Sequence, residues 1–222
     1  MNKYIIVITF ILFLSGCVTT ENIGKMEAYP KMYEEKPISI VVLPAINKTT
    51  AADATDLFST TVAQPLAEAG FYVVSIPYVN HVLALEGIQD GAQVRDIPTE
   101  RFNYLFGADA VLFVTIDQWD TTYLLTVADV TVGLKFELIS TKTSEVLWQQ
   151  QRVIVHETTS NDSGSILFDI IATAVTTAAT DYVPIARQVN SQILNTIPLG
   201  KYHPRYQLDA NDGSGQTKKV KH

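Results

Sequence analysis

The chain has 222 residues with 16 basic and 23 acidic side chains, which leaves a formal net charge of −7. Such an acidic chain is unsuited to nucleic acid, because phosphate binding needs clustered Lys and Arg. It contains one cysteine, so it can form no internal disulfide and offers no cysteine-rich metal site. The length is sufficient for one domain with a sizeable core.

The N-terminal segment has the pattern of a bacterial lipoprotein signal peptide. After Lys3, an apolar run over 4–14 is too short to span a bilayer. It is followed by Ser15, Gly16 and Cys17, the order of a lipobox. We therefore expect cleavage between Gly16 and Cys17 and a lipid on Cys17, where each buried methylene contributes about 0.8 kcal/mol to membrane binding. The alternative is an unmodified cysteine after a chance apolar run.

The segment over 17–37 is predicted to be a lipidated tether between the membrane and a folded domain. It lacks apolar periodicity and contains Pro30, which is typical of a linker. Its side chains best suited to local packing on the domain are Tyr29, Met32 and Tyr33.

The domain begins with the pattern of a strand, a helix and a second strand. Residues 38–43 form a β-branched run that ends at Pro44, typical of a strand buried on both faces. Apolar side chains recur at helical spacing over about 53–69, where Pro65 is expected to kink the helix or to limit its regular hydrogen bonding. Residues 71–76 are predicted to be the next strand of a right-handed βαβ unit.

Two short helices and a third strand follow. One helix is predicted to end at Gly87, and a second, capped by Thr99, is predicted to end at Gly107. Residues 110–117 have the pattern of a buried strand, which we expect to continue to Trp119.

The pattern then changes to alternation over 121–140, which predicts a strand with one face exposed to water. A turn over 141–144 and a strand over about 145–155 complete an antiparallel hairpin. A strongly apolar helix is predicted over 166–179 and a last helix over 185–194.

These elements predict a mixed α/β fold in the order β-α-β-α-α-β-β-β-α-α. The sheet should have about five strands, parallel at first and antiparallel at the end, and helices should cover it. We expect one domain over 38–204, after the signal peptide over 1–16 and the tether.

Residues 205–222 are predicted to be a disordered tail. Small residues such as Gly213 favour disorder there. The tail carries a basic cluster, which is predicted to be solvated, with contact to acidic lipid head groups as the alternative; its members are Lys218, Lys219 and Lys221.

Two sets of apolar side chains are candidates for partner binding. The apolar helix over 166–179 must be covered by the sheet on one side and by the last helix or another subunit on the other, and we expect Ile166 and Ile170 to contact a partner or another subunit. Large aromatic side chains near strand ends often anchor partners, although core packing is the preferred interpretation of those in this chain. Three of them lie there: Trp119, Tyr123 and Trp148.

We expect no catalysis, no bound metal and no cofactor beyond the lipid. The chain's histidines, at 81, 156, 203 and 222, have no neighbour at metal-ligand spacing. Nucleophile elbow, phosphate-binding loop and dinucleotide fingerprint are all missing from the sequence. A hydrolase would need Asp117 and Asp120 as a carboxylate pair, but the preferred interpretation is that they cap and solvate a strand end.

Three segments carry a family resemblance: Ile40-Val41-Val42-Leu43-Pro44 with Asn47 and Thr49, Phe106-Gly107-Ala108-Asp109-Ala110, and Thr141-Lys142-Thr143 with Glu145-Val146-Leu147-Trp148. Together they resemble the superfamily of CsgG-like and TolB-N-terminal-like periplasmic lipoprotein domains. Within it, the chain most resembles a family of bacterial lipoproteins of unknown function first noted among neisserial vaccine candidates, whose ending is similar to residues 199–204. Ser144 departs from the pattern, since CsgG-like hairpins usually have Gly there.

The resemblance implies an outer-membrane lipoprotein that works in an envelope assembly, alongside CsgG-like and other small lipoproteins, without catalytic residues. Val18 follows Cys17 where Asp would signal retention in the inner membrane. The leading prediction is therefore a non-enzymatic adaptor on the periplasmic side of the outer membrane.

Two alternatives remain open. One is a homo-oligomeric secretion pore of CsgG type, in which residues 121–140 would form a membrane hairpin, although an ordinary half-exposed strand is preferred. The other is a regulator of a peptidoglycan synthase, because lipoproteins that activate such enzymes share the fold.

Overall fold

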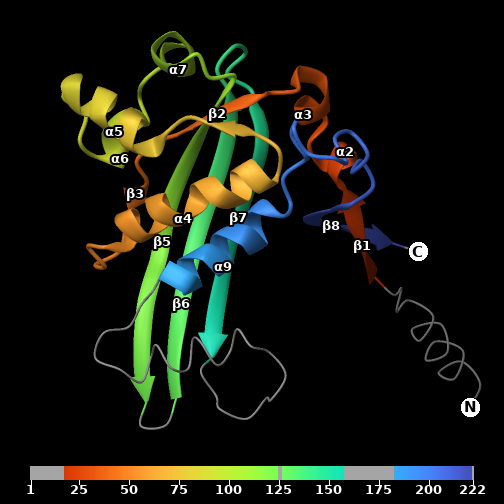
Figure 1. The fold of residues 1–222 in the computed structure, drawn as a ribbon. Helices are drawn as coiled ribbons and strands as arrows, with labels where there is room; N and C mark the ends of the chain where they lie inside the picture. The colour runs from red at the N-terminus through yellow and green to blue at the C-terminus, as the bar shows by residue number, and fades with distance from the viewer. Residues whose placement is uncertain (1–17, 125–126, 158–182, 222) are drawn as a thin grey trace, which may run out of the picture.

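The computed structural model describes residues 18–124, 127–157 and 183–221. Its main sheet consists of six strands: β2 (Ser39–Val42), β3 (Ile46–Asn47), β4 (Tyr72–Val73), β5 (Ala110–Leu124), β6 (Val127–Ser140) and β7 (Val146–Glu157). The strand order is β4-β2-β5-β6-β7, with β3 also paired to β5 (Figure 1). The first pairs are parallel and the last two antiparallel, which confirms the predicted mixed sheet.

One face of the sheet is covered by two packed helices, α4 (Ala54–Glu68) and α9 (Val183–Leu194) (Figure 1). Phe58 of α4 meets Phe136 of β6 edge-on, with ring centroids 6.0 Å apart. Phe136 in turn contacts Trp148 of β7, which is fully buried. The alternating apolar side chains of the predicted hairpin therefore form the main core, as aromatic pairs in edge-on contact do in other cores.

The opposite face is covered at one end by three short helices: α5 (Ile76–Leu85), α6 (Gly91–Val94) and α7 (Thr99–Phe106). They enclose a second hydrophobic cluster, in which Phe102 of α7 packs edge-on against Phe113 at 6.2 Å. Val41 and Val111 face this cluster, whereas the residues next to them face the main core. Strands β2 and β5 are thus buried on both faces, as their unbroken apolar runs predict.

The predicted strand over 71–76 is wrong in its second half, because Ile76 begins α5. Pro77 lies in the first turn of α5, where its fixed φ suits a helix and its missing N–H is not needed. Pro65 lies inside α4, yet that helix continues for three residues beyond it.

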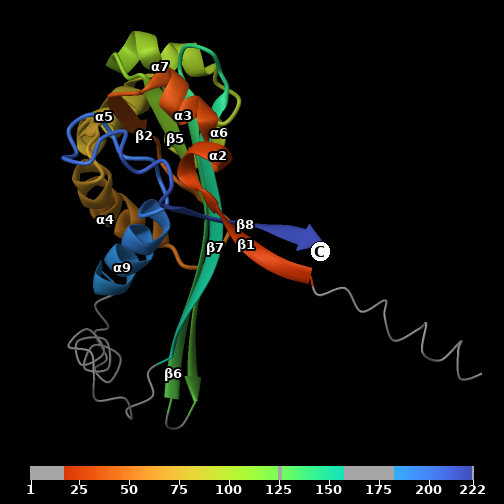
Figure 2. The ribbon, with the colours of Figure 1, turned by 90° about the vertical axis from the view of Figure 1, so that its right-hand side faces the viewer.

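The terminal segments differ most from the prediction. Residues 18–35, expected to be a tether, form β1 (Val18–Gly24), α2 (Lys25–Ala28) and α3 (Pro30–Glu35). The expected disordered tail contains β8 (Gly213–Lys221), which pairs antiparallel with β1 in a separate two-stranded ribbon (Figure 2). Each strand supplies the backbone partners of the other, so neither needs the apolar periodicity on which the prediction depended. The expected local packing is confirmed for Tyr29 and Met32, which are buried.

The later elements match the prediction with one difference. Strand β5 runs to Leu124 rather than to Trp119, so residues 121–124 belong to it and β6 begins at Val127. Strands β6 and β7 form the expected antiparallel hairpin, and α9 includes the expected helix over 185–194. The predicted helix over 166–179, with Ile166 and Ile170, lies outside the described residues, as do the signal peptide and Cys17.

Candidate interaction surfaces

Strand β7 is a long edge of the main sheet, and in the described part of the chain it pairs with β6 alone. Strands β5, β6 and β7 continue past α4 and α9, so the far end of the sheet stands clear of the helices (Figure 1). There Val153 is 57% exposed and Val155 is 54% exposed. Because Ile154 packs on the main core, alternation places these two valines on the opposite face.

The first half of the β7 edge is covered by the terminal segments. The Tyr29 hydroxyl donates to the Gln149 carbonyl at 3.3 Å, and Gln150 Nε2 donates to the Ser214 carbonyl at 2.7 Å. Gly215 of β8 also lies close to the Arg152 guanidinium. Among the described residues, no hydrogen bond joins the terminal segments to residues 153–155. Natural proteins usually protect an edge with Lys, Pro or a covering loop, so an open edge with exposed valines is a candidate docking surface. We call residues 153–155 the open edge.

Trp119 and Trp148, the candidates for partner binding, are buried and therefore do not offer a surface to a partner. Trp148 is fully buried between Tyr29 and Phe136, with ring centroids 6.5 and 6.0 Å away, and Trp119 is 6% exposed. Both belong to the main core, which is the preferred interpretation from the sequence. The Tyr123 side chain lies outside the described residues.

A β-bulge explains why Trp119 points inward. Ile116 pairs with Leu134 and Gln118 pairs with Gly133, so Asp117 is an extra residue on β5. The extra residue reverses the alternation beyond it, and Trp119 therefore shares the core-facing side with Ile116.

From Val132 to Leu138, strand β6 is an ordinary sheet strand, the interpretation preferred from the sequence. Its side chains at 132, 134, 136 and 138 are buried in the main core beneath α4 and α9. Among the described helices, none is both long and apolar enough to cross a membrane.

The terminal segments are held to the domain by a buried polar cluster of Lys25, Tyr33 and Asp209, which we call the terminal clasp. Lys25 Nζ donates to the Ile197 carbonyl at 2.7 Å and lies 3.5 Å from the Asp209 carboxylate. Asp209, which is fully buried, also accepts from the Leu199 N–H at 2.8 Å and from the Tyr33 hydroxyl at 3.2 Å. The chain directly after the anchor site is thereby fixed to the segment that leads into β8.

Burial sets the ionisation of this cluster. It lowers the pKa of Lys25, although the neighbouring Asp209 carboxylate opposes that shift. Burial and the charge of Asp209 both raise the pKa of Tyr33, which keeps its hydroxyl protonated as a donor. The clasp is therefore structural, with every polar group engaged inside the protein.

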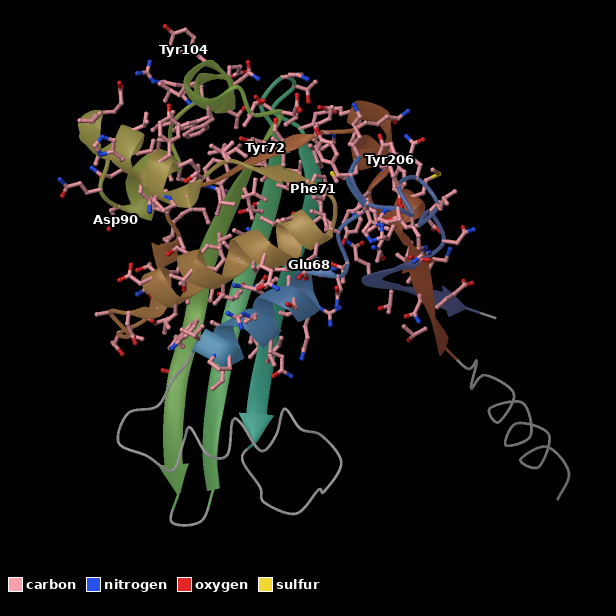
Figure 3. All side chains as sticks on the ribbon, viewed as in Figure 1. Glu68, Phe71, Tyr72, Asp90, Tyr104 and Tyr206 are labelled. Carbon is pink, nitrogen blue, oxygen red and sulfur yellow. The ribbon has the colours of Figure 1, made fainter. Side chains whose placement is uncertain are left out.

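A polar cleft of about 470 Å³ lies at the carboxyl end of β2, between α4, α5 and α6. Ligands often bind at such strand ends, and the lining includes the carboxylates of Asp56 and Asp90 but no Lys or Arg. Asp90, at the start of α6 (Figure 3), caps that helix by accepting from the Ala92 N–H at 2.7 Å. Asn47 holds the neighbouring loop by donating to the Ala51 carbonyl at 2.7 Å. These polar groups are occupied by the fold itself.

The other titratable candidates do not converge on a reactive site. Asp117 forms a surface ion pair with Lys48 at 3.0 Å, and Asp120 is exposed. Among the described residues, no three His, Cys, Asp or Glu side chains are placed to hold a metal ion. His203 accepts from the Arg205 N–H at 3.0 Å, which is a turn contact.

The residues that carry the family resemblance build a structural hub at the start of β5. Asp109 accepts from the backbone N–H groups of Ile38 and Ser39 at 3.0 and 3.2 Å and from Lys142 Nζ at 2.7 Å. The Thr141 hydroxyl donates to the Ala108 carbonyl at 2.6 Å. These contacts join the β2 strand, the β5 strand and the hairpin turn after β6.

Comparison with known proteins shows the family of the chain. The family model described as "Putative lipoprotein GNA1162-like" matches residues 27–199. The chain belongs to the GNA1162-like lipoprotein family. This confirms the predicted neisserial lipoprotein family, whereas the wider placement among CsgG-like and TolB-like domains stays a prediction.

Individual proteins of known sequence or structure are also similar to this chain. "Putative lipoprotein NMB1124/NMB1162" of Neisseria meningitidis serogroup B is 27% identical over 190 residues, which cover 86% of this chain and 87% of that protein. The crystal structure of lipoprotein GNA1162 from Neisseria meningitidis is 31% identical, with a TM-score of 0.52 over 63% of this chain and 95% of that chain. A PelC dodecamer from Paraburkholderia phytofirmans is 16% identical, with a TM-score of 0.45 over 81% and 96% of the two chains, too low to support an argument.

Sequence reasoning missed both the open edge and the terminal clasp. The sequence predicts β7 as a strand, but which strand is an edge depends on the pairing order. The clasp joins residues more than 170 positions apart, and a lone Lys and a lone Asp carry no periodic signal. The available hint was the pair of apolar side chains at Tyr29 and Met32 in a polar segment.

Proposed function

We propose that this GNA1162-like protein is a non-enzymatic adaptor, anchored through lipid on Cys17 to the periplasmic side of the outer membrane. Its role is to hold another envelope protein within an assembly or secretion complex. The family of lipoproteins to which it belongs and the lipobox support the anchor. The terminal clasp supports the adaptor role, because it connects the anchored end of the chain rigidly to the domain.

The observation that carries the proposal is the open edge at residues 153–155. An unpaired strand offers backbone N–H and C=O groups to a strand of another protein, and exposed side chains on it add selectivity. Val153 and Val155 would be covered by such a partner. The absence of a reactive arrangement among the described residues is the reason that binding, rather than catalysis, is proposed.

A second copy of the chain is the alternative occupant, because an antiparallel pair of β7 strands would be self-complementary. That arrangement would favour the homo-oligomeric secretion component of CsgG type. A regulator of a peptidoglycan synthase is a special case of the adaptor, in which the partner is the synthase.

The test is the mass of the lipidated complex, extracted gently from membranes, for the native chain and for the double variant Val153→Lys with Val155→Lys. Lysines on an edge strand oppose pairing, so we expect the amount of complex to fall at least about tenfold. The matched control is Leu85→Lys with Tyr104→Lys, which adds the same charge at two exposed apolar side chains on α5 and α7.

The composition of the complex distinguishes the adaptor from the homo-oligomeric secretion component. A second envelope protein that is lost from the edge variant and retained in the control supports the adaptor. A closed ring of identical subunits would favour the homo-oligomeric secretion component over the adaptor. A native complex that survives unchanged in the edge variant refutes docking on β7.

A further inference from the structure

The pairing of the terminal ribbon brings a basic segment beside the lipid anchor. In the register of β1 and β8, Lys221 stands opposite Val18 and Lys219 opposite Thr20. Paired strands lie about 4.8 Å apart, so the backbone of Lys221 lies one strand spacing from the residue that follows Cys17 in the sequence. These lysines, about 200 positions from Val18 and Thr20 in the sequence, are thus paired with the first residues of β1.

Charge is segregated between this ribbon and the rest of the protein. Removal of the signal peptide takes away Lys3 and leaves 15 basic and 23 acidic side chains, a balance of −8. The ribbon, in contrast, carries three lysines and one acid, Glu21. Lys218 is partly neutralised, since its Nζ lies 3.0 Å from Glu27 and 3.9 Å from Glu21. By sequence the ribbon has a net charge of +2, and the backbone register places Lys219 and Lys221 opposite the first residues of β1.

The shape of the molecule puts this charge where a membrane surface would be. The ribbon projects from the domain, and β1 begins at its outer end (Figures 1 and 2). An acyl chain on Cys17 would hold that outer end at the lipid surface. Lysines within a Debye length of an anionic surface each strengthen membrane binding about fivefold.

We propose that Lys219 and Lys221, with a smaller contribution from Lys218, bind the phosphate groups of anionic lipids in the membrane that carries Cys17. This inference rests on the lipid anchor of the proposed function but on no protein partner. The protein is then anchored in two ways, by the lipid and by the basic patch. Together they fix the ribbon against the membrane surface, so that the domain does not rotate freely about the lipid.

The test uses the full lipidated protein with a dye on Thr217→Cys, an exposed position of β8. The sulfur of Cys17 is blocked by lipid, so this is the sole free thiol in the chain. The protein is placed in vesicles of phosphatidylcholine, with or without phosphatidylglycerol, that contain lipids with a quencher in the head group. Intact mass first establishes the acylation of Cys17, so a failed anchor is recognised separately.

We expect strong quenching in the anionic vesicles, weak quenching in the neutral ones, and release by salt. The variant Lys218→Gln, Lys219→Gln, Lys221→Gln should lower the ratio of docked to undocked ribbon at least about 25-fold, about fivefold for each of the last two lysines. The control Lys31→Gln, Lys48→Gln, Lys201→Gln changes the net charge equally and should keep the native quenching.

Three results would overturn the proposal. They are equal quenching in neutral and anionic vesicles, unchanged quenching in the ribbon variant, and equal losses in the ribbon variant and its control. Inorganic phosphate at constant ionic strength should not displace the ribbon. If it does, the lysines bind free phosphate rather than a lipid surface.

Discussion

Asp209→Ala is the sharpest perturbation of the terminal clasp. Asp209 is fully buried, so its removal leaves the Lys25 ammonium, itself 4% exposed, with the Ile197 carbonyl as its remaining partner. It also takes the acceptor from the Leu199 N–H and the Tyr33 hydroxyl. Breaking one side of a buried ion pair costs about 3–5 kcal/mol, and we expect a loss of that size in the free energy of unfolding.

The loss is measured by urea unfolding at neutral pH, followed by tryptophan fluorescence, since Trp148 contacts Tyr29, which lies between Lys25 and Tyr33 in the sequence. Lys25→Met removes the ammonium charge that Asp209→Ala leaves buried without its carboxylate partner. The double variant should therefore cost at least about 2 kcal/mol less than the sum of the two single variants.

The exposed ion pair between Arg205 and Asp212, 3.0 Å apart, is the matched control, and Arg205→Ala should cost about 0–1 kcal/mol. If Asp209→Ala costs no more than this control, or if the two clasp substitutions are additive, the clasp does not act as a coupled buried pair.

The hub and the hairpin turn allow two more predictions. Burial alone would raise the pKa of Asp109, but hydrogen bonds from Lys142 and two backbone N–H groups lower it overall. The free energy of unfolding should then fall as the pH drops from about 4 through the folded pKa. In Asp109→Asn, the thermal unfolding temperature should fall less steeply than in the native chain between about pH 6 and pH 3. Equal slopes for the two proteins would contradict this. Ser144 has φ +60°, a backbone conformation that strains any residue except Gly. Ser144→Gly should therefore be about 1 kcal/mol more stable than Ser144→Ala in urea unfolding, because both lose the hydroxyl but only Gly relieves the backbone strain. Equal stabilities would refute the strain.

The central elements could be predicted because each carries its own apolar pattern. Strand β5 is marked by an unbroken apolar run, β6 by alternation, and α9 by helical spacing. Ser144 is a finer case. The sequence departs from the glycine usual in similar hairpins, yet the residue keeps the left-handed conformation that a glycine there would adopt.

The features that escaped prediction depend on pairing between distant residues or on a single inserted residue. Trp119 faces the core because of the bulge at Asp117. No rule of sequence composition identifies Asp117 as the extra residue. The ribbon of β1 and β8 consists of polar strands that stabilise each other through backbone hydrogen bonds. Because neither strand has apolar periodicity, the sequence alone predicts both segments to be unstructured.

The ribbon also sets an order on the maturation of the protein. In the described chain β1 pairs with β8 alone, so residues 18–24 have no strand partner until residues 213–221 have been made. At synthesis rates of about 5–20 residues per second, at least about 10 s separate the two strands. During that interval residues 18–24 are without their β8 partner. The ribbon can therefore close only after all six strands of the main sheet have been synthesised.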